Sequence, residues 1–82
     1  MFYIVAIKIS PRNKTAPKVQ EILTKHGCII KTRLGLHEAS IKNCSTSGLI
    51  LLDLIGDDKE KINDLTNELN SLEAVKAKLL EI

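Results

Sequence analysis

Two short segments of the chain are apolar on both of their alternating faces, and this limits the folds that it can adopt. Phe2–Ile9 is rich in β-branched and aromatic side chains, and Gly48–Ile55 is apolar at nearly every position. Alternate residues of a strand point to opposite sides of a sheet, so a strand that is apolar throughout needs cover on both sides. The pattern therefore predicts two strands that lie inside a sheet.

The residues after the first of these strands predict a loop and a helix. Ser10–Lys14 is polar and connects the two elements. Thr15 fits the N-cap of a helix over Ala16–His26, because Pro17 then falls in the first turn, where its missing N–H costs nothing. Gly27 fits a C-terminal stop. The apolar residues of this helix recur at helical spacing: Val19, Ile22 and Leu23, followed by His26.

An edge strand and a long polar loop are predicted next. Cys28–His37 alternates between an apolar set and a mixed set, which is typical of a strand with one buried face. The apolar set is Cys28, Ile30, Thr32, Leu34 and Leu36. Glu38–Ser47 is polar and reads as a loop.

The C-terminal third predicts a second helix and a last strand. Asp57 followed by Glu60 resembles a capping box with Asp in place of Ser or Thr. The helix that follows, Asp58–Ser71, carries an apolar stripe. That stripe is Ile62, Leu65, Leu69 and Leu72. Ala74–Ile82 alternates apolar residues with lysines, and lysines are typical of an edge strand that avoids unwanted pairing.

The elements follow the order β-α-β-β-α-β, which is the ferredoxin-like arrangement of the α+β class. Its 82 residues are enough for a single domain, residues 1–82. Right-handed crossovers place both helices on one face of a four-stranded antiparallel sheet. In this topology the first and third strands are central, and these are the two strands that are apolar on both sides.

One face of the predicted sheet has no helix to cover it. Each central strand leaves one apolar set on that face, and soluble monomers generally avoid exposing an apolar patch of more than a few hundred Å². We therefore expect a second copy of the chain to cover it, in a homodimer or a homotetramer built through sheet faces. The alternative is that the loop Glu38–Ser47 or a chain end folds over the sheet.

Charge and aromatic content argue against nucleic acid as a direct partner. Twelve Lys and Arg residues against ten Asp and Glu leave a net charge of +2. Phe2 and Tyr3 are the only aromatic residues, so the third strand has none on which a base could stack.

No stretch approaches the apolar length of a membrane span, and no secretory signal is recognisable.

The two cysteines, Cys28 and Cys44, indicate reduced thiols in a cytoplasmic protein of bacterial type. They are too few for a disulfide scaffold and form no CxxC pair, although one disulfide between them remains an alternative. We expect no cofactor, because an iron–sulfur cluster needs four thiolates in tight spacing.

No arrangement of residues predicts an enzyme. Cys28 follows the C-terminal end of a helix, whose negative dipole disfavours a thiolate. His26 is expected to be satisfied by the last carbonyls of its helix. Asp53 is unusual inside an apolar strand: it is either a functional carboxylate or, as we prefer, one that pairs with a neighbouring Lys or Arg or lies at the rim of an interface.

Two features near the predicted polar loop could take a ligand. His37 and Cys44 flank the loop and would act as metal or redox ligands only if two or more chains combined them. Cys44–Gly48 is a hydroxyl-rich turn that could present backbone N–H groups to an anion. The plain alternatives are an exposed histidine, a packed thiol and a solvated turn.

Four stretches of this sequence resemble a known family. They are Arg33–Glu38, Cys44–Gly48, Leu49–Asp57 and Leu69–Val75, within a likeness that extends from Tyr3 to Lys78. The family consists of small ACT-like proteins named iron-only hydrogenase system regulators, similar to the ligand-sensing half of the nickel-responsive repressor. The resemblance implies an ACT-type fold, assembly through sheets and ligand sites at subunit boundaries.

The resemblance and the residues together predict a non-enzymatic regulatory module that acts as a homo-oligomer and takes a small ligand between its subunits, or a regulatory protein as partner. The candidate ligand-binding residues at the interface are His37, Glu38, Cys44, Ser45, Thr46 and Ser47. The alternative function is a metal- or redox-linked sensor that uses His37 and Cys44 across an interface. The repressor's nickel site uses several histidines, whereas this chain has only His26 and His37, so we expect no nickel site.

Overall fold

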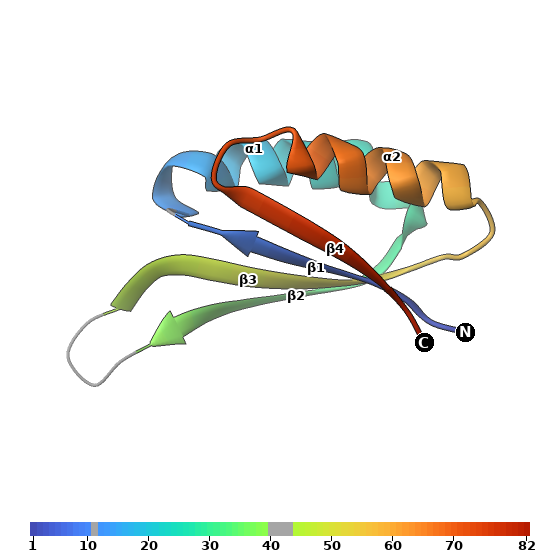
Figure 1. The fold of residues 1–82 in the computed structure, drawn as a ribbon, viewed down its shortest axis with the longest axis horizontal. Coiled ribbons are helices and arrows are strands. Elements are labelled where there is room, and N and C mark those ends of the chain that lie inside the picture. The colour runs from blue at the N-terminus through green and yellow to red at the C-terminus, as the bar shows by residue number, and fades with distance from the viewer. Residues whose placement is uncertain (11, 40–43) are drawn as a thin grey trace.

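Four antiparallel strands form one sheet, and two helices lie on one of its sides (Figure 1). This computed structural model describes the backbone of residues 1–10, 12–39 and 44–82, and the side chains of residues 1–10, 15–35 and 48–82. The elements are β1 (Tyr3–Ile9), α1 (Arg12–Lys25), a 3₁₀ turn (Gly27–Ile29), β2 (Ile30–Ala39), β3 (Cys44–Leu54), α2 (Lys59–Asn70) and β4 (Val75–Glu81). Their order and layers confirm the predicted ferredoxin-like arrangement.

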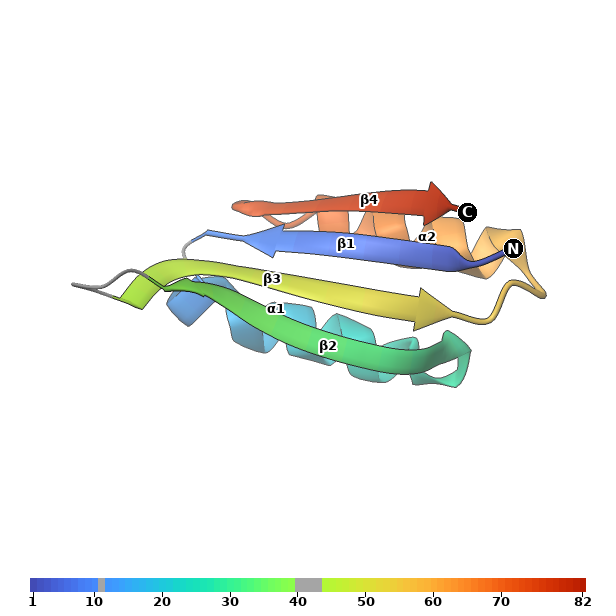
Figure 2. The same cartoon turned by 90° about the horizontal axis from the view of Figure 1, so that it is seen from below.

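The sheet order is β2-β3-β1-β4, so β1 and β3 are central as predicted (Figure 2). Residue Val5 of β1 is paired with Leu52 of β3 and with Leu79 of β4. Residues in register share a face, so the odd-numbered residues of β1 and the even-numbered residues of β3 face the helices together. Val5 and Leu52 are completely buried there.

The core lies between this face of the sheet and the apolar stripes of the two helices. The fully or almost fully buried residues are Val5, Ile7, Ile9, Val19, Ile22, Leu23, Leu52, Leu54, Ile62, Leu65, Leu69, Val75 and Ala77. The predicted stripes of both helices are therefore confirmed, with Leu72 only partly buried at the end of its stripe. Burial of this apolar surface is the main term that stabilises the fold.

The first helix is longer than predicted. It begins at Arg12 rather than Ala16, so Thr15 is not its N-cap and Pro17 lies inside it. The chain turns into the helix almost directly after β1, where the Ser10 N–H donates to the Ala74 carbonyl. Proline prefers the first turn of a helix, but that is a preference, and packing of the apolar stripe on the sheet outweighs one missing hydrogen bond. The helix ends at Lys25, close to the stop predicted from Gly27. Gly27 does not adopt the positive φ that is usual for a glycine at a helix C-terminus.

The second strand and the polar loop were also placed wrongly. Cys28 belongs to the 3₁₀ turn, and β2 starts two residues later, at Ile30. Most of the segment predicted as a loop is strand, because Ala39 is paired with Cys44 and His37 with Gly48. Backbone hydrogen bonds between antiparallel strands need no apolar side chains, so the ladder extends past the point where the alternating pattern ends.

The second helix begins one residue later than the capping motif suggested. Asp58, not Asp57, is the N-cap, and its carboxylate accepts hydrogen bonds from the backbone N–H groups of Glu60 (3.0 Å) and Lys61 (3.4 Å). Adjacent aspartates give equivalent sequence signals, so the pattern could not separate them. The cap fixes the start of α2, directly after the turn that leaves β3.

Gly56, in that turn, allows a close approach of the Tyr3 ring. A Cβ atom on Gly56 would overlap two atoms of the ring and lie 3.1 Å from its Cζ atom. The Lys59 ammonium lies 5.8 Å from the centroid of this ring and 3.1 Å from a Glu81 carboxylate oxygen, so a shift of the ring would also disturb this contact. Gly56 is therefore required for packing rather than for a special backbone angle.

We predict that Gly56→Ala lowers the free energy of unfolding by about 1–3 kcal/mol, the usual cost of overpacking. Gly35→Ala is the matched control, because a Cβ at Gly35 meets nothing within 4 Å. Urea denaturation followed by circular dichroism measures both variants. Equal stability of the two variants would contradict the close approach of Tyr3.

Candidate functional site

The predicted ligand-binding residues lie at the tip of the β2–β3 hairpin. The register pairs His37 with Gly48 and Ala39 with Cys44, so the backbone brings both ends of the predicted set to the same end of the sheet, beyond the helices (Figure 1). Their side chains lie outside the described residues. The set His37, Glu38, Cys44, Ser45, Thr46 and Ser47 therefore stays a prediction.

The alternative of a disulfide between Cys28 and Cys44 is wrong. Cys28 is an exposed, free thiol at one end of β2, and Cys44 lies beside the other end. A strand of ten residues separates them by about 30 Å, whereas a disulfide needs Cα atoms within about 7 Å. Among the described residues there is no group of three or more His, Cys, Asp or Glu that could hold a metal ion.

The side of the sheet opposite the helices is uncovered, as predicted. We call this surface the bare face. Its described residues are Ile4, Ala6, Lys8, Thr32, Leu34, Leu49, Leu51, Asp53, Lys76, Lys78 and Leu80. Leu34, Leu49 and Leu80 keep 51%, 37% and 48% of their surface exposed. Large aliphatic residues are therefore in contact with solvent in the isolated chain.

The chain does not cover this face with its own ends. Phe2 and Ile82 exchange backbone hydrogen bonds of 2.6 and 2.9 Å, which prolongs the ladder between β1 and β4 instead of crossing the sheet. The described parts of β2 and β3 remain paired to the end of the hairpin. Figure 2 shows the bare face with no helix or described loop across it. The alternative in which a chain end covers the sheet is therefore wrong.

Asp53 is an acidic residue on a mainly apolar part of the bare face. Its strand neighbours are Ile4 of β1 and Thr32 of β2. One carboxylate oxygen, Oδ1, is buried and has no hydrogen-bond partner. The preferred pairing with a Lys or Arg is therefore not found within the described part of the chain. A buried polar atom without a partner is costly, and none of the described residues donates to this oxygen.

Two of the three lysines of the bare face, Lys8 and Lys76, lie toward its other end. Lys8 is paired with Lys76, and both are exposed. Together with Ser10, Ala74 and Val75 they line a small open cavity of about 210 Å³. This end of the bare face is therefore basic, whereas the other end carries the acidic residue Asp53.

The outer edge of β4 is occupied by a side chain of α2. The Asn70 side-chain amide donates to the Ala77 carbonyl (3.0 Å), and its oxygen accepts from the Ala77 N–H (2.8 Å). Asn70 thus imitates a neighbouring strand at this point. An incoming strand would have to displace it, so strand addition at β4 is disfavoured.

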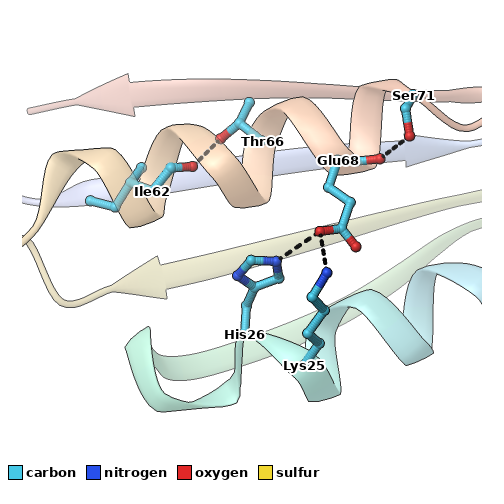
Figure 3. Close-up of polar contacts among 6 residues, drawn as sticks. All are labelled: Lys25, His26, Ile62, Thr66, Glu68 and Ser71. Atoms are coloured by element: carbon cyan, nitrogen blue, oxygen red, sulfur yellow. Dashed lines mark hydrogen bonds and ion pairs between the residues drawn. The ribbon is translucent and has the colours of Figure 1, made fainter.

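A polar cluster joins the two helices on the other side of the molecule (Figure 3). The Glu68 carboxylate of α2 accepts hydrogen bonds from Lys25 Nζ (3.0 Å) and His26 Nε2 (3.1 Å). These contacts lower the pKa of Glu68 below its ordinary value of 4.5, the His26 hydrogen bond contributing most. His26 was expected to bind the last carbonyls of its helix, but its ring contacts Glu68 instead. The sequence pattern missed this pairing because the two residues are far apart in the chain.

The cluster lies beside a shallow groove between α1 and α2. The groove has a volume of about 590 Å³ and is lined by Lys18, Glu21, Ile22, Lys25, Glu68 and Leu72. Its ionic groups neutralise one another, and the groove is open to solvent. We therefore regard it as the seam of the helix layer rather than as a binding site.

Residues 1–79 match the family described as "TM1266-like: Iron-only hydrogenase system regulator, putative". The chain belongs to this family. The fold predicted from the strand pattern is therefore the same as the fold that the resemblance to this family implied. No curated protein sequence matches the chain closely enough to show a relationship. No helix among the described residues is long and apolar enough to cross a membrane.

Solved structures with similar folds include a member of this family. The uncharacterized protein TM1266 from Thermotoga maritima is 26% identical, with a TM-score of 0.80 over 96% of this chain and 92% of its own. CPII, a nitrogen regulatory PII-like protein from Thiomonas intermedia K12 bound to ADP, AMP and bicarbonate, is 9% identical, with a TM-score of 0.67 over 99% and 89%. The periplasmic divalent cation tolerance protein CutA from Archaeoglobus fulgidus is 10% identical, with a TM-score of 0.53 over 100% and 84%. The last two show the fold alone.

We predict that Glu68→Gln destabilises this TM1266-like chain at neutral pH. A carboxyl whose folded pKa is lowered stabilises the fold above its unfolded pKa, and this contribution is lost as the pH falls through the folded pKa. The difference in unfolding free energy between wild type and variant should therefore be constant at neutral pH and shrink in acid below pH 4.5. Thermal denaturation across pH measures it.

Glu73→Gln is the matched control for this prediction. Glu73 is exposed and pairs with no described residue, so its replacement should leave stability unchanged at every pH. A Glu68→Gln effect that persists undiminished in acid would contradict the role of the carboxylate.

Proposed function

We propose that the chain is a non-enzymatic regulatory domain that works as a homo-oligomer through its bare faces and binds a small ligand at the boundary between copies. The bare face is the observation that carries this proposal. It holds aliphatic residues on all four strands, and full burial of one leucine side chain stabilises a complex by about 1.5–3 kcal/mol. A second copy offers the same apolar surface in return.

Other routes to self-association have less support. Asn70 occupies the outer edge of β4 at Ala77, so addition of a strand at that edge would cost two hydrogen bonds. The helix layer presents mainly polar side chains to solvent, and Lys25, His26 and Glu68 already pair with one another. Association through the sheet face breaks no described hydrogen bond.

The regulatory part of the proposal is supported by the family, whose members are described as regulators of a hydrogenase system. A catalytic role has no support, because the free thiol Cys28 has no described histidine or carboxylate bonded to it. The cytoplasmic location expected from the two cysteines stays a prediction.

We predict that the wild-type chain is a dimer or tetramer and that Leu34→Glu weakens association at least tenfold. Leu34 is half exposed in the single chain, so the charge disturbs the interface and not the fold. Size-exclusion chromatography with light scattering, at a series of concentrations, measures the oligomeric state. Asn63→Glu, on the exposed side of α2, is the control and should associate like wild type. A wild-type monomer at micromolar concentration would refute the proposal.

We predict that an anionic ligand raises the melting temperature of the oligomer through the hairpin tip. ADP, AMP and bicarbonate are suitable probes, because a PII-like protein of the same fold binds them. Binding to the folded state alone stabilises by RT ln(1 + [L]/Kd), so saturating ligand should shift the transition by several degrees. A variant with Ser45→Ala and Thr46→Ala should lose the shift, and no shift in wild type with any probe contradicts ligand binding of this class. The metal-linked alternative through His37 and Cys44 stays a prediction, for which Zn²⁺ in the same assay is the test.

A further inference from the structure

We propose that two copies join their bare faces around a two-fold axis that runs across the strands, and that Asp53 of each copy accepts a hydrogen bond from Lys8 of the other. This inference rests on the proposed self-association and specifies its geometry. Its evidence is the position of three kinds of residue on the bare face: Asp53, whose Oδ1 atom has no hydrogen-bond partner, a central part that is apolar apart from Lys78, and the exposed pair Lys8 and Lys76.

The strand register divides the bare face into three rows that run across the sheet. The acidic row contains Thr32, Asp53, Ile4 and Leu80; the middle row contains Leu34, Leu51, Ala6 and Lys78; the basic row contains Leu49, Lys8 and Lys76. Neighbouring rows are two residues apart along each strand, which is about 7 Å. The middle row is therefore equidistant from the acid and from the lysines.

Two simple two-fold arrangements bring the faces together, and they differ in which charges meet. An axis parallel to the strands lays each row over itself, so the two Asp53 carboxylates come close together in a dry interface. An axis across the strands, through the middle row, lays the acidic row of one copy over the basic row of the other. Like charges in a water-poor interface are costly, whereas opposite charges in reach of one another are favourable. The second arrangement is therefore preferred.

The dimensions allow the contact between copies and exclude it within one copy. Asp53 and Lys8 of the same chain are four residues apart along the sheet, about 14 Å, because Lys8 is paired with Leu49. Across the proposed interface, Asp53 lies opposite the partner's Leu49, one strand away from the partner's Lys8. Packed sheets are about 10 Å apart and neighbouring strands about 4.8 Å, a gap that the flexible four-carbon stem of lysine can bridge.

The pair would fix the orientation of the complex more than its strength. The desolvation free energy of the two charges offsets most of their mutual attraction. A carboxylate that is buried in the interface without its donor is nevertheless strongly destabilising. Lys78 is the one charge that meets its own copy in this arrangement. It lies on the edge strand β4 and is exposed, so water and salt screen it at the rim.

Charge reversal distinguishes this arrangement. Asp53→Lys places lysine opposite lysine at both symmetric contacts, and Lys8→Asp places acid opposite acid. Each variant alone should associate at least tenfold more weakly than wild type. An equimolar mixture should form a heterodimer with wild-type affinity, because both contacts then join a lysine to an aspartate. Sedimentation equilibrium measures the affinity, native mass spectrometry identifies the heterodimer, and circular dichroism establishes that each variant is folded.

The results separate this inference from the proposed function. A monomeric wild type overturns both. A wild-type oligomer whose variants associate normally alone, or gain nothing when mixed, overturns the across-strand arrangement and leaves self-association standing. Asp53→Asn and Lys8→Gln replace any charge-reversal variant that does not fold, and both should weaken association, since each removes one charge of the pair.

Cross-linking gives an independent measurement in a background with Cys28→Ser and Cys44→Ser. Leu34→Cys lies on the proposed axis, so it should cross-link to its own copy through a short bismaleimide. Leu49→Cys should not, because the two copies of residue 49 would lie about 14 Å apart along the strands. Efficient cross-linking through Leu49→Cys would show the axis parallel to the strands and overturn the inference.

Discussion

The structure depends on a mismatch between a sheet with two apolar sides and a helix layer that covers only one. In β3 the alternation is plain: Leu52 is completely buried under the helices, and Leu51, its neighbour, points to the bare face. The hydrophobic effect acts on both residues, but none of the described helices or strands buries the second. A chain of this length reaches full burial most simply by association.

The polar groups on the two sides of the sheet consequently differ in whether they have hydrogen-bond partners. On the helix side the polar groups find partners within the chain: Glu68 joins the helices, and Asn70 closes the outer edge of β4. On the bare face Asp53 keeps a buried oxygen without a donor. Native proteins leave few such groups, and in the proposed arrangement the donor to Asp53 is Lys8 of the second copy. The proposed recognition surface is therefore the sheet and not the helix layer.

Much of the fold could be predicted from the sequence because side-chain alternation reports burial directly. The two-sided strands identified the centre of the sheet, and the helical stripes identified its cover. The ends of the elements were less certain. Pro17 suggested a later start for α1, adjacent aspartates left the cap of α2 ambiguous, and the β2–β3 ladder continued through polar residues because backbone hydrogen bonds do not depend on side-chain type. Asp53 could be recognised as unusual, but its lack of a partner depends on strand register and could not.

The register also gives the bare face a direction, which apolar area alone lacks. Leucines can meet in many orientations with similar energy, so apolar area alone would favour the proposed association without selecting its geometry. In the proposed complex, Asp53 at one end of the bare face and Lys8 and Lys76 at the other would favour one orientation of the two copies. In the across-strand arrangement, the hairpin end of one copy lies toward the paired chain ends, Phe2 and Ile82, of the other. A ligand at the hairpin tip would then contact both copies, so its binding would be coupled to their association. Such coupling is what the proposed regulatory function needs, because a ligand can shift an equilibrium only by binding one of its states more tightly.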